Sequence, residues 1–483
     1  MEFTSESRPN HSTSILERIS KRGEANDSKT EGTFDDGTIV ATPEPADSII
    51  GKQELDLENS IPQNAEDIKS PVKIPDGGWK AWLTVFGAWC LLFPTYGTTY
   101  ASDVYQDLYI RSYLPSYSPS TIGWIASTQL FVNFSMGFLV GKALDAGYFY
   151  HTVSLATLLY IISYFMLSLA QQDAFYQIFL SQGVAAGIAL GCICLSAVNV
   201  VTHHFNERRG FAIGIVLSGC SCGGVVIPIL LNKFIAKEGF AQATRNVAYL
   251  STGMIVLAIL LMRIRLPPPS KAKEVQSSLS PIPPLTIKDL VMDTRYMLAI
   301  AGVFFGVVGL LTPTCFLQLY AVVHSVDQDL TSYIIAILNG AAIIGRIFPS
   351  FLSDIWGPFN VILVCTYTCV ALMFAMLAAT NPGGIIFIAI LYGFFSGAYI
   401  SLSNPLFLNM VNSLGETGTR LGFAYSIIAF AALIGTPIAG ALLTRDLLWA
   451  RPFCFSGACL ILGFGCLFAS RHLTARQKGT WKV

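Results

Sequence analysis

Acidic side chains are scarce over most of this chain. Of its 30 aspartate and glutamate residues, the first 80 positions hold 16, which leaves only 14 for all the rest. A membrane-embedded enzyme needs several titratable groups in one place, and a charge at mid-bilayer costs about 2.5 kcal/mol or more. The scarcity of carboxylates therefore argues against an enzyme.

Several other features are missing. The sequence has no Walker-type phosphate loop, which argues against an ATP-driven pump. Its start lacks the basic segment, apolar core and cleavage site of a secretory signal. All 11 cysteines lie in apolar segments without nearby histidine or carboxylate partners, so no metal site and no cofactor is expected. Nucleic acid is not an expected partner either.

Apolar segments fill the chain after residue 80. Hydrophobic residues make up 53% of the sequence and the mean hydropathy is +0.56. A bilayer core needs about 20 apolar helical residues for each crossing. The pattern predicts an all-α membrane protein with crossings near 83–103, 121–141, 149–170, 175–200, 209–233, 244–264, 294–320, 331–352, 358–380, 383–410, 419–441 and 450–470.

The twelve crossings divide into two groups of six. Residues 1–80 are rich in Ser, Thr, Pro and acids and predict a disordered, acidic, cytosolic tail. An N-terminal six-helix bundle is expected over 81–265 and a C-terminal one over 294–470. The proline-rich segment 266–293 is predicted to be a cytosolic linker, and 471–483 a cytosolic C-terminal tail.

Lysine and arginine indicate the orientation in the membrane. They are more frequent in the loops on the side of the two termini, which predicts that both termini are cytosolic. The basic cluster from Lys233 to Arg245 falls on the opposite, outer side and does not fit this bias. No retention signal ends the sequence, so the plasma membrane is the expected location, with a vacuolar membrane as the alternative.

Two loops carry a repeated motif. The loop after the second crossing holds Gly141, Asp145 and Gly147, and the matching loop of the second half holds Asp354 and Gly357. Glycine permits a tight reversal, and the aspartate can cap a helix N-terminus. An ordinary Asp-Gly turn explains either copy alone. Two copies at equivalent places resemble the loop signature of the major facilitator superfamily, whose layout is two six-helix halves.

A second resemblance is more specific. The segment before the first crossing includes Asp76, Gly77, Gly78, Trp79 and Trp82. The segment 204–214 includes Arg208 and Arg209, and Gly345-Arg346 follows in the eighth crossing. Together these segments resemble the monocarboxylate porter family, particularly its fungal branch, over residues 75–470. By themselves, the two signatures either set topology and helix register or contact a substrate directly.

This resemblance implies a transporter that opens a mid-membrane site to each side in turn. In the family, the residue equivalent to Arg346 belongs to the site for substrate and protons. Two departures weigh against proton symport. The family's proton-linked members have an acid one turn before that arginine, where this chain has Ala342. They also have a lysine in the first crossing, where this chain has Tyr100. Asp103 is the nearest alternative group for coupling protons.

Arg346 stands out without the resemblance, because it lies well inside an apolar run. An ionisable residue within a membrane helix marks a functional site by default. The arginine guanidinium can donate two parallel hydrogen bonds to one carboxylate. The alternatives are a structural ion pair or a snorkelling side chain. Further candidates for substrate binding are polar and aromatic residues at a similar depth in the membrane: Asn133, Asn339, Asn404, Tyr100 and Phe316. The alternative is that these side chains form hydrogen bonds or packing contacts between helices.

The sequence therefore predicts a secondary active or facilitative transporter that contacts the lipid bilayer, a small organic solute such as a carboxylate anion, and protons as a further candidate partner. Relatives in the fungal branch include vitamin carriers and proteins of secondary metabolism. Export of a secondary metabolite is thus the first alternative to transport of a monocarboxylate-like or vitamin-like solute. A non-transporting nutrient sensor on the same fold is the alternative from another class.

Overall fold

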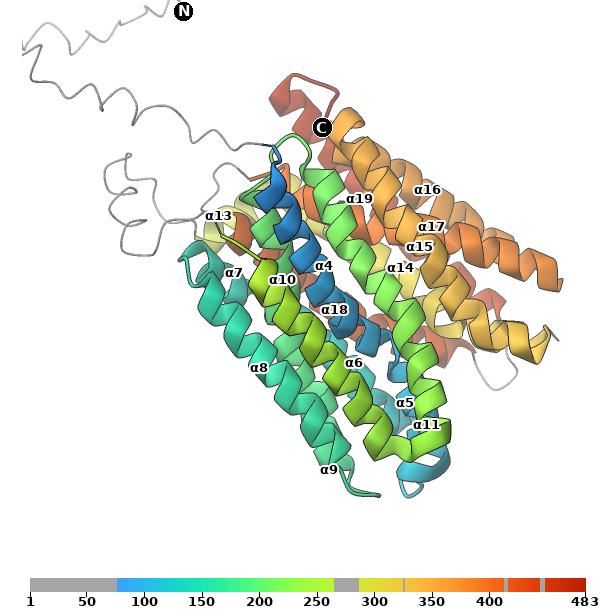
Figure 1. Cartoon of the computed structure of the whole chain (residues 1–483). Coiled ribbons are helices and arrows are strands. Elements are labelled where there is room, and N and C mark those ends of the chain that lie inside the picture. Colours follow the sequence, from blue (N-terminus) through green and yellow to red (C-terminus); the bar gives the residue numbers. More distant parts are fainter. Residues whose placement is uncertain (1–75, 265–285, 325, 412–415, 444–447) are drawn as a thin grey trace, which may run out of the picture. The chain divides into compact units, whose positions relative to one another are not determined.

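The computed structural model describes residues 76–264, 286–324, 326–411, 416–443 and 448–483. The predicted acidic tail lies outside these residues except for 76–80, and the predicted linker except for 286–293. Every regular element within the described ranges is a helix (Figure 1). The all-α class predicted from hydropathy is therefore confirmed.

Residues 76–264, called the first half below, begin with a helix that contains an internal proline, Pro94. Ser118 starts the next long helix by accepting a hydrogen bond from the Thr121 backbone nitrogen at 3.2 Å, with Pro119 at the first helical position. The helical elements of this half are α4 (Trp79–Tyr100), α5 (Ser102–Leu108), η1 (Tyr109–Tyr113), α6 (Pro119–Ser135), α7 (Gly137–Asp145), α8 (Phe149–Ser168), α9 (Phe175–Ile178), η2 (Phe179–Ala185), α10 (Ala186–Thr202) and α11 (Arg209–Leu261).

Helix α11 contains the fifth and sixth predicted crossings. Its two arms meet at Gly239, whose φ of 79° lies in the left-handed region that glycine adopts without strain. Figure 1 shows the arms running in different directions from this point. The loop expected between residues 233 and 244 is thus replaced by a kink, because a single glycine suffices to redirect the chain.

Residues 286–483, the second half, start with a short capped helix. The Thr286 hydroxyl accepts from the Asp289 backbone nitrogen, and the Asp289 carboxylate accepts from the Thr286 nitrogen at 3.0 Å. The helices of this half are α13 (Ile287–Met292), α14 (Thr294–Val323), α15 (Gln328–Trp356), α16 (Pro358–Met376), α17 (Pro382–Leu408), α18 (Thr417–Leu443) and α19 (Ala450–Lys478).

Ten of the helices within the described ranges are long and apolar enough to cross a membrane. The 53-residue helix α11 is one of them and holds two predicted crossings. Helix α4, with 22 residues, follows the remaining predicted crossing. The predicted set of twelve crossings is therefore accounted for.

The last helix is longer than predicted. The final crossing was expected to end at residue 470, but α19 continues to Lys478. The Ser470 hydroxyl donates to the Arg295 carbonyl oxygen at 2.7 Å, and Lys478 Nζ donates to the Asn409 carbonyl oxygen at 2.9 Å. These bonds to α14 and to the end of α17 fix the extra turns, so much of the predicted C-terminal tail is helical.

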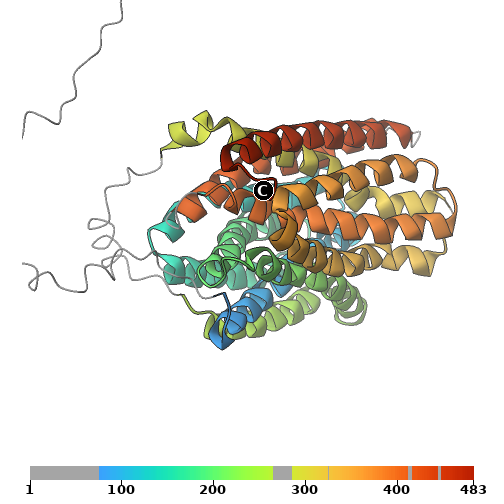
Figure 2. The same ribbon diagram turned by 90° about the horizontal axis from the view of Figure 1, so that it is seen from above.

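The two halves meet mainly where α6 and α7 pack on α18 and where α11 packs on α15 and α17. Seen from above in Figure 2, the blue-to-green helices gather on one side and the yellow-to-red helices on the other. The end of the molecule that carries Asp145 and Asp354 is the one predicted to be cytosolic. It is called the inner end below, and the opposite end the outer end.

Candidate functional site

Arg346 lies where the two halves meet. It is on α15, and only 3% of its surface is exposed. Its Nη1 donates to the Leu217 carbonyl oxygen on α11 at 3.1 Å, and its Nη2 donates to the Tyr100 hydroxyl on α4 at 3.1 Å. Its Nε has no hydrogen-bond partner, and Arg346 makes no ion pair with any residue in the described ranges. A full positive charge is thus held by neutral groups alone.

Tyr100 and Asn339 approach each other beside this charge. A Cβ atom on Gly224 would lie 2.7 Å from Tyr100 Cδ2 and 3.2 Å from Asn339 Cγ. The two side chains therefore converge over a glycine of α11, and no larger residue fits at that position without displacing them. Three of the residues expected in the site, Arg346, Tyr100 and Asn339, are brought together here.

Two more predicted residues lie in pairs that extend this polar region. Asn133 Nδ2 donates to the Tyr96 hydroxyl at 3.1 Å, and the Tyr425 hydroxyl donates to Asn404 Oδ1. The ring of Phe134, next to Asn133 in the chain, packs on the Tyr425 ring with centroids 5.7 Å apart. The pairs thus face a common region between the first and second halves, and in each the amide is bonded to a tyrosine of another helix.

Phe316 and Asp103 lie further towards the outer end. The Phe316 ring is 3.6 Å from where a Cβ on Gly440 would be. Asp103 is exposed on α5 and makes no ion pair within the described ranges, and Cys315 of α14 is exposed as well. Phe316, Asp103 and Cys315 are not part of the Arg346 cluster, and their outer position is called the outer part of the route below.

Asp145 and Asp354 each hold a helix of the opposite half. The Asp145 carboxylate accepts from the backbone nitrogens of Gly418 and Thr419, at 2.8 and 2.7 Å, at the start of α18. The Asp354 carboxylate accepts from Gly210 and Phe211 at 2.7 and 2.8 Å, at the start of α11. A negative charge at a helix N-terminus satisfies unpaired N–H groups and the helix dipole. These two carboxylate contacts, called the latches below, hold the inner ends of the halves together.

Glycines allow the same helices to touch through their backbones. A Cβ on Gly141 would lie 2.0 Å from the Gly418 carbonyl oxygen, and one on Gly422 would lie 2.1 Å from the Gly137 carbonyl oxygen. Gly147 and Gly357 have φ of 86° and 89°, so both loops also need glycine to reverse the chain. The inner end is therefore closed by direct helix contact as well as by the latches.

The segment before the first crossing, which contains Asp76, orders the backbone at this inner end. Asp76 accepts from the backbone nitrogens of Asn206 and Glu207 at 2.5 and 2.6 Å, and from Arg208 at 3.5 Å. The other members of the two sequence signatures surround this cap. Gly77 and Gly78 have positive φ, Trp79 is exposed, Trp82 packs on the Phe205 ring at 5.0 Å, and Arg209 donates to Asn206. These contacts order the entry to α4 and α11 and do not involve the Arg346 side chain.

Three participants were not predicted from the sequence. Tyr425 is one tyrosine in an apolar helix, and its role depends on Asn404 of another helix. Leu217 contributes only its carbonyl oxygen, which any residue has. Tyr96 is the hydrogen-bond partner of Asn133. The one indication in the sequence is that a tyrosine hydroxyl within an apolar run needs a hydrogen-bond partner on a neighbouring helix.

Comparisons with known proteins find a matching family and several relatives of this sequence. Residues 81–416 match the family described as the Major Facilitator Superfamily. An MFS-type transporter of Ophiocordyceps is 35% identical over 397 residues, which cover 82% of this chain and 85% of that protein. The aspyridones efflux protein of Emericella nidulans is 34% identical, with 84% and 80% covered. The fujikurins efflux protein of Gibberella fujikuroi is 31% identical, with 87% and 90% covered.

Solved structures share the fold. The proton:xylose symporter XylE bound to 6-bromo-6-deoxy-D-glucose gives a TM-score of 0.63 at 13% identity, with 81% of this chain and 94% of that chain covered. Likeness at this identity concerns the fold alone. It confirms the twelve-helix arrangement predicted from the sequence.

Proposed function

Because this chain belongs to the major facilitator superfamily, we propose that it exports a small organic metabolite with an anionic group across the plasma membrane. Relatives named as efflux proteins for aspyridones and fujikurins support the direction. Uptake of a monocarboxylate-like or vitamin-like solute, the leading prediction from the sequence, has less support. Membership of the monocarboxylate porter family remains a prediction.

The observation that carries this proposal is the unbalanced charge of Arg346. Burying a charge is costly unless a partner of opposite sign is present, and here its two partners are the neutral Leu217 carbonyl and Tyr100 hydroxyl. A bound carboxylate or enolate supplies the missing negative charge and two oxygen acceptors for the guanidinium. An anion is therefore the ligand that gains most at this position.

The surrounding groups suit an organic solute. Asn133, Asn339 and Asn404 offer amide groups, while Tyr96 and Tyr425 offer ring faces and hydroxyls. A few polar groups among apolar and aromatic walls are typical of sites for small organic molecules. The polar groups would orient the solute, and the rings would cover its apolar part.

The conformation supports release at the outer end. The inner end is closed by the latches of Asp145 and Asp354, whereas Asp103 and Cys315 are exposed on the outer part of the route. Rocking of the two halves would open the inner end for loading. Asp103 is the group we propose for proton coupling, since it is the one carboxylate among the residues named on this route.

The test measures efflux from cells that express the protein and are loaded with a panel of labelled aromatic carboxylic acids, which enter in their neutral form. We expect Arg346→Ala to reduce efflux of every transported acid by about ten-fold or more, because a charge-assisted pair contributes about 1.5–3 kcal/mol. Arg346→Lys should retain part of the activity, since lysine keeps the positive charge but lacks the paired N–H donors of the guanidinium.

The matched control is Asp103→Asn, which removes a charge from the same route but leaves Arg346 unchanged. We expect it to bind the acids normally while efflux loses its response to a protonophore. Surface labelling verifies that every variant reaches the membrane. Equal efflux by Arg346→Ala and the unaltered protein, at equal surface levels, would exclude an anion site at Arg346.

A further inference from the structure

A separate groove lies away from Arg346, at the inner end of the second half. Its volume is about 620 Å³, and it is enclosed by α15, α16, α17 and the end of the chain. Its lining includes Phe348, Ile355, Trp356, Val364, Trp481 and Lys482. The size is within the range of pockets for small organic ligands, and nearly all of these side chains are apolar.

The groove opens towards the bilayer. Phe348 is 56% exposed on α15 and Val364 is 62% exposed on α16, both within helices that span the membrane. Apolar side chains exposed on a membrane-spanning helix face lipid, not water. An occupant that enters from this side must therefore carry a hydrocarbon chain.

One end of the groove carries Lys482, the one charged residue of its lining. Lys482 and Ile355 are shared with an adjoining cavity of about 650 Å³, whose lining also holds Arg208, Glu207 and Asp354. Trp356 and Trp481 are exposed beside this end, and tryptophan prefers the level of the lipid headgroups. The groove thus has an apolar body below a cationic rim at headgroup depth.

The position of Lys482 is fixed by its neighbours. Asn360 Nδ2 donates to the Trp481 carbonyl oxygen at 3.0 Å, and the Phe359 backbone nitrogen donates to the Val483 carbonyl oxygen at 3.1 Å. Arg471 Nε donates to Asn360 Oδ1 at 2.5 Å, and the guanidinium covers the Trp481 ring at 5.3 Å. The segment 481–483 is therefore docked, and it holds the Lys482 ammonium at the rim.

We propose that this groove binds one anionic glycerophospholipid, with an acyl chain against α15 and α16 and its phosphate at Lys482. Lys482 is the one charged residue in the lining of the groove itself, and it favours an anion over a neutral headgroup. In the adjoining cavity the charge of Arg208 is opposed by Glu207 and Asp354, so the phosphate belongs on the groove side of Lys482. This binding does not depend on the transported solute.

The test uses the full-length protein purified in detergent, with phosphatidylglycerol and phosphatidylcholine of identical acyl chains as probes. Native mass spectrometry measures the affinity for each lipid. We expect phosphatidylglycerol to bind several-fold more tightly, and Lys482→Gln to weaken it about five-fold without affecting phosphatidylcholine. Val364→Trp should weaken both lipids because the indole fills the apolar body.

The matched control is Lys142→Gln, which removes an exposed lysine at the same end but on α7, outside the groove. It should leave both affinities unchanged. Equal binding of the two lipids by the unaltered protein would overturn the proposal, as would equal losses in Lys142→Gln and Lys482→Gln. Displacement of the lipid by soluble glycerol 3-phosphate would show a site for free phosphate and would also overturn it.

Discussion

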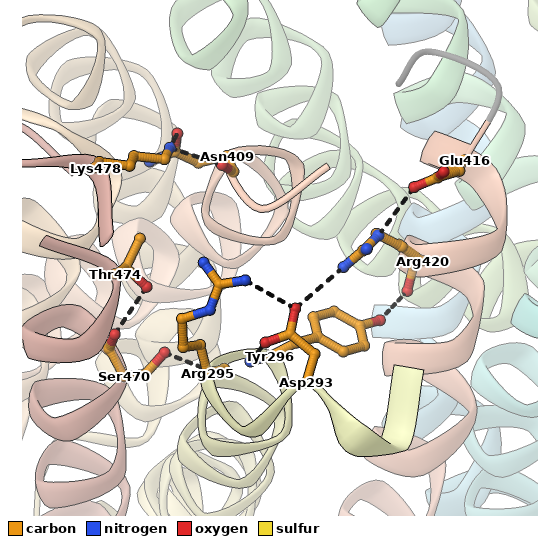
Figure 3. A network of polar contacts seen from close by, with 9 residues as sticks. All are labelled: Asp293, Arg295, Tyr296, Asn409, Glu416, Arg420, Ser470, Thr474 and Lys478. Atoms are coloured by element: carbon orange, nitrogen blue, oxygen red, sulfur yellow. Dashed lines mark hydrogen bonds and ion pairs between the residues drawn. The ribbon is translucent and has the colours of Figure 1, made fainter. Parts of the chain in front are cut away.

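Two buried arginines of this protein have opposite surroundings. Arg420, on α18, is paired with Asp293 at 3.6 Å and Glu416 at 3.4 Å, and its guanidinium lies 5.5 Å from the Tyr296 ring (Figure 3). Arg346 has only neutral partners. The charge of Arg420 is balanced within the protein and stabilises the inner end of the second half, whereas that of Arg346 is not balanced by any acid in the described ranges.

Replacing Arg420 should destabilise the fold. Arg420→Met leaves Glu416 without its cation and Asp293 with Arg295 alone, and the two acidic side chains are only 15% and 16% exposed. We expect the free energy of unfolding to fall by about 2 kcal/mol or more, since removing one partner of a buried pair leaves an unbalanced charge. Thermal unfolding of the purified protein measures the change.

The control for this prediction is Arg295→Met. Arg295 pairs with the same Asp293 at 3.2 Å, but its side chain is 27% exposed. Solvent screens such a pair, so a loss below about 1 kcal/mol is expected. If the two variants were equally stable, burial would not explain the role of Arg420.

At the scale of elements, closure of the inner end depends on helix pairs without side chains between them. Helix α7 meets α18 where Gly137 and Gly141 face Gly422 and Gly418. On the other side, Gly214 of α11 approaches the Arg346 carbonyl oxygen, at 2.5 Å from where its Cβ would be. The backbone of Arg346 is thus part of the contact that closes the inner end.

Adding one methyl group at this contact should open the inner end. In Gly422→Ala the new Cβ meets the Gly137 carbonyl oxygen, which belongs to a rigid helix backbone. Overpacking costs about 1–3 kcal/mol, enough to change the ratio of the two conformations about ten-fold. The exposed thiol of Cys315 on the outer route should then react more slowly with a membrane-impermeant maleimide.

Gly440→Ala is the matched control, because it makes the same change on the same helix. The nearest atom to its new Cβ is Phe316 Cζ at 3.6 Å, an ordinary contact. Labelling of Cys315 should be unchanged in this variant, and Cys315→Ser gives the background from the other cysteines. An unchanged rate in Gly422→Ala would show that the contact of α7 and α18 does not govern access.

At the scale of the whole molecule, the chain is a multi-pass membrane transporter and not an enzyme, as its family establishes. Its orientation remains a prediction. The basic residues Lys233 and Lys237 lie exposed on α11 near the kink at Gly239, at the outer end. They are the main exception to the positive-inside bias.

Labelling from outside the cell tests the orientation. In a background whose reactive cysteines are replaced, Lys237→Cys should react with an impermeant maleimide in intact cells, and Lys142→Cys should react only after permeabilisation. The reason is that the more basic end stays in the cytosol during insertion. The reverse pattern would show that the latched end faces outwards.

The sequence by itself determined the membrane class, the approximate helices and the unusual place of Arg346 within an apolar run; that Arg346 binds a substrate stays a prediction. These depend on local properties, because a run of apolar residues must become a helix in lipid, and a charge within that run is costly wherever the helix packs. The repeated aspartate loops were visible for the same reason, since turn chemistry depends on adjacent residues.

Only the tertiary structure decided which residues meet. Asp145 and its partner Gly418 are 273 positions apart, and Arg346 and Tyr100 are 246 apart. The pairing of Asn404 with Tyr425, the exclusion of Phe316 from the Arg346 cluster and the lipid-facing groove all depend on how helices from distant parts of the chain pack. Hydropathy specifies that a helix enters the membrane, but it carries no information on which face meets which neighbour, because that choice is made by shape and hydrogen bonding between the assembled helices.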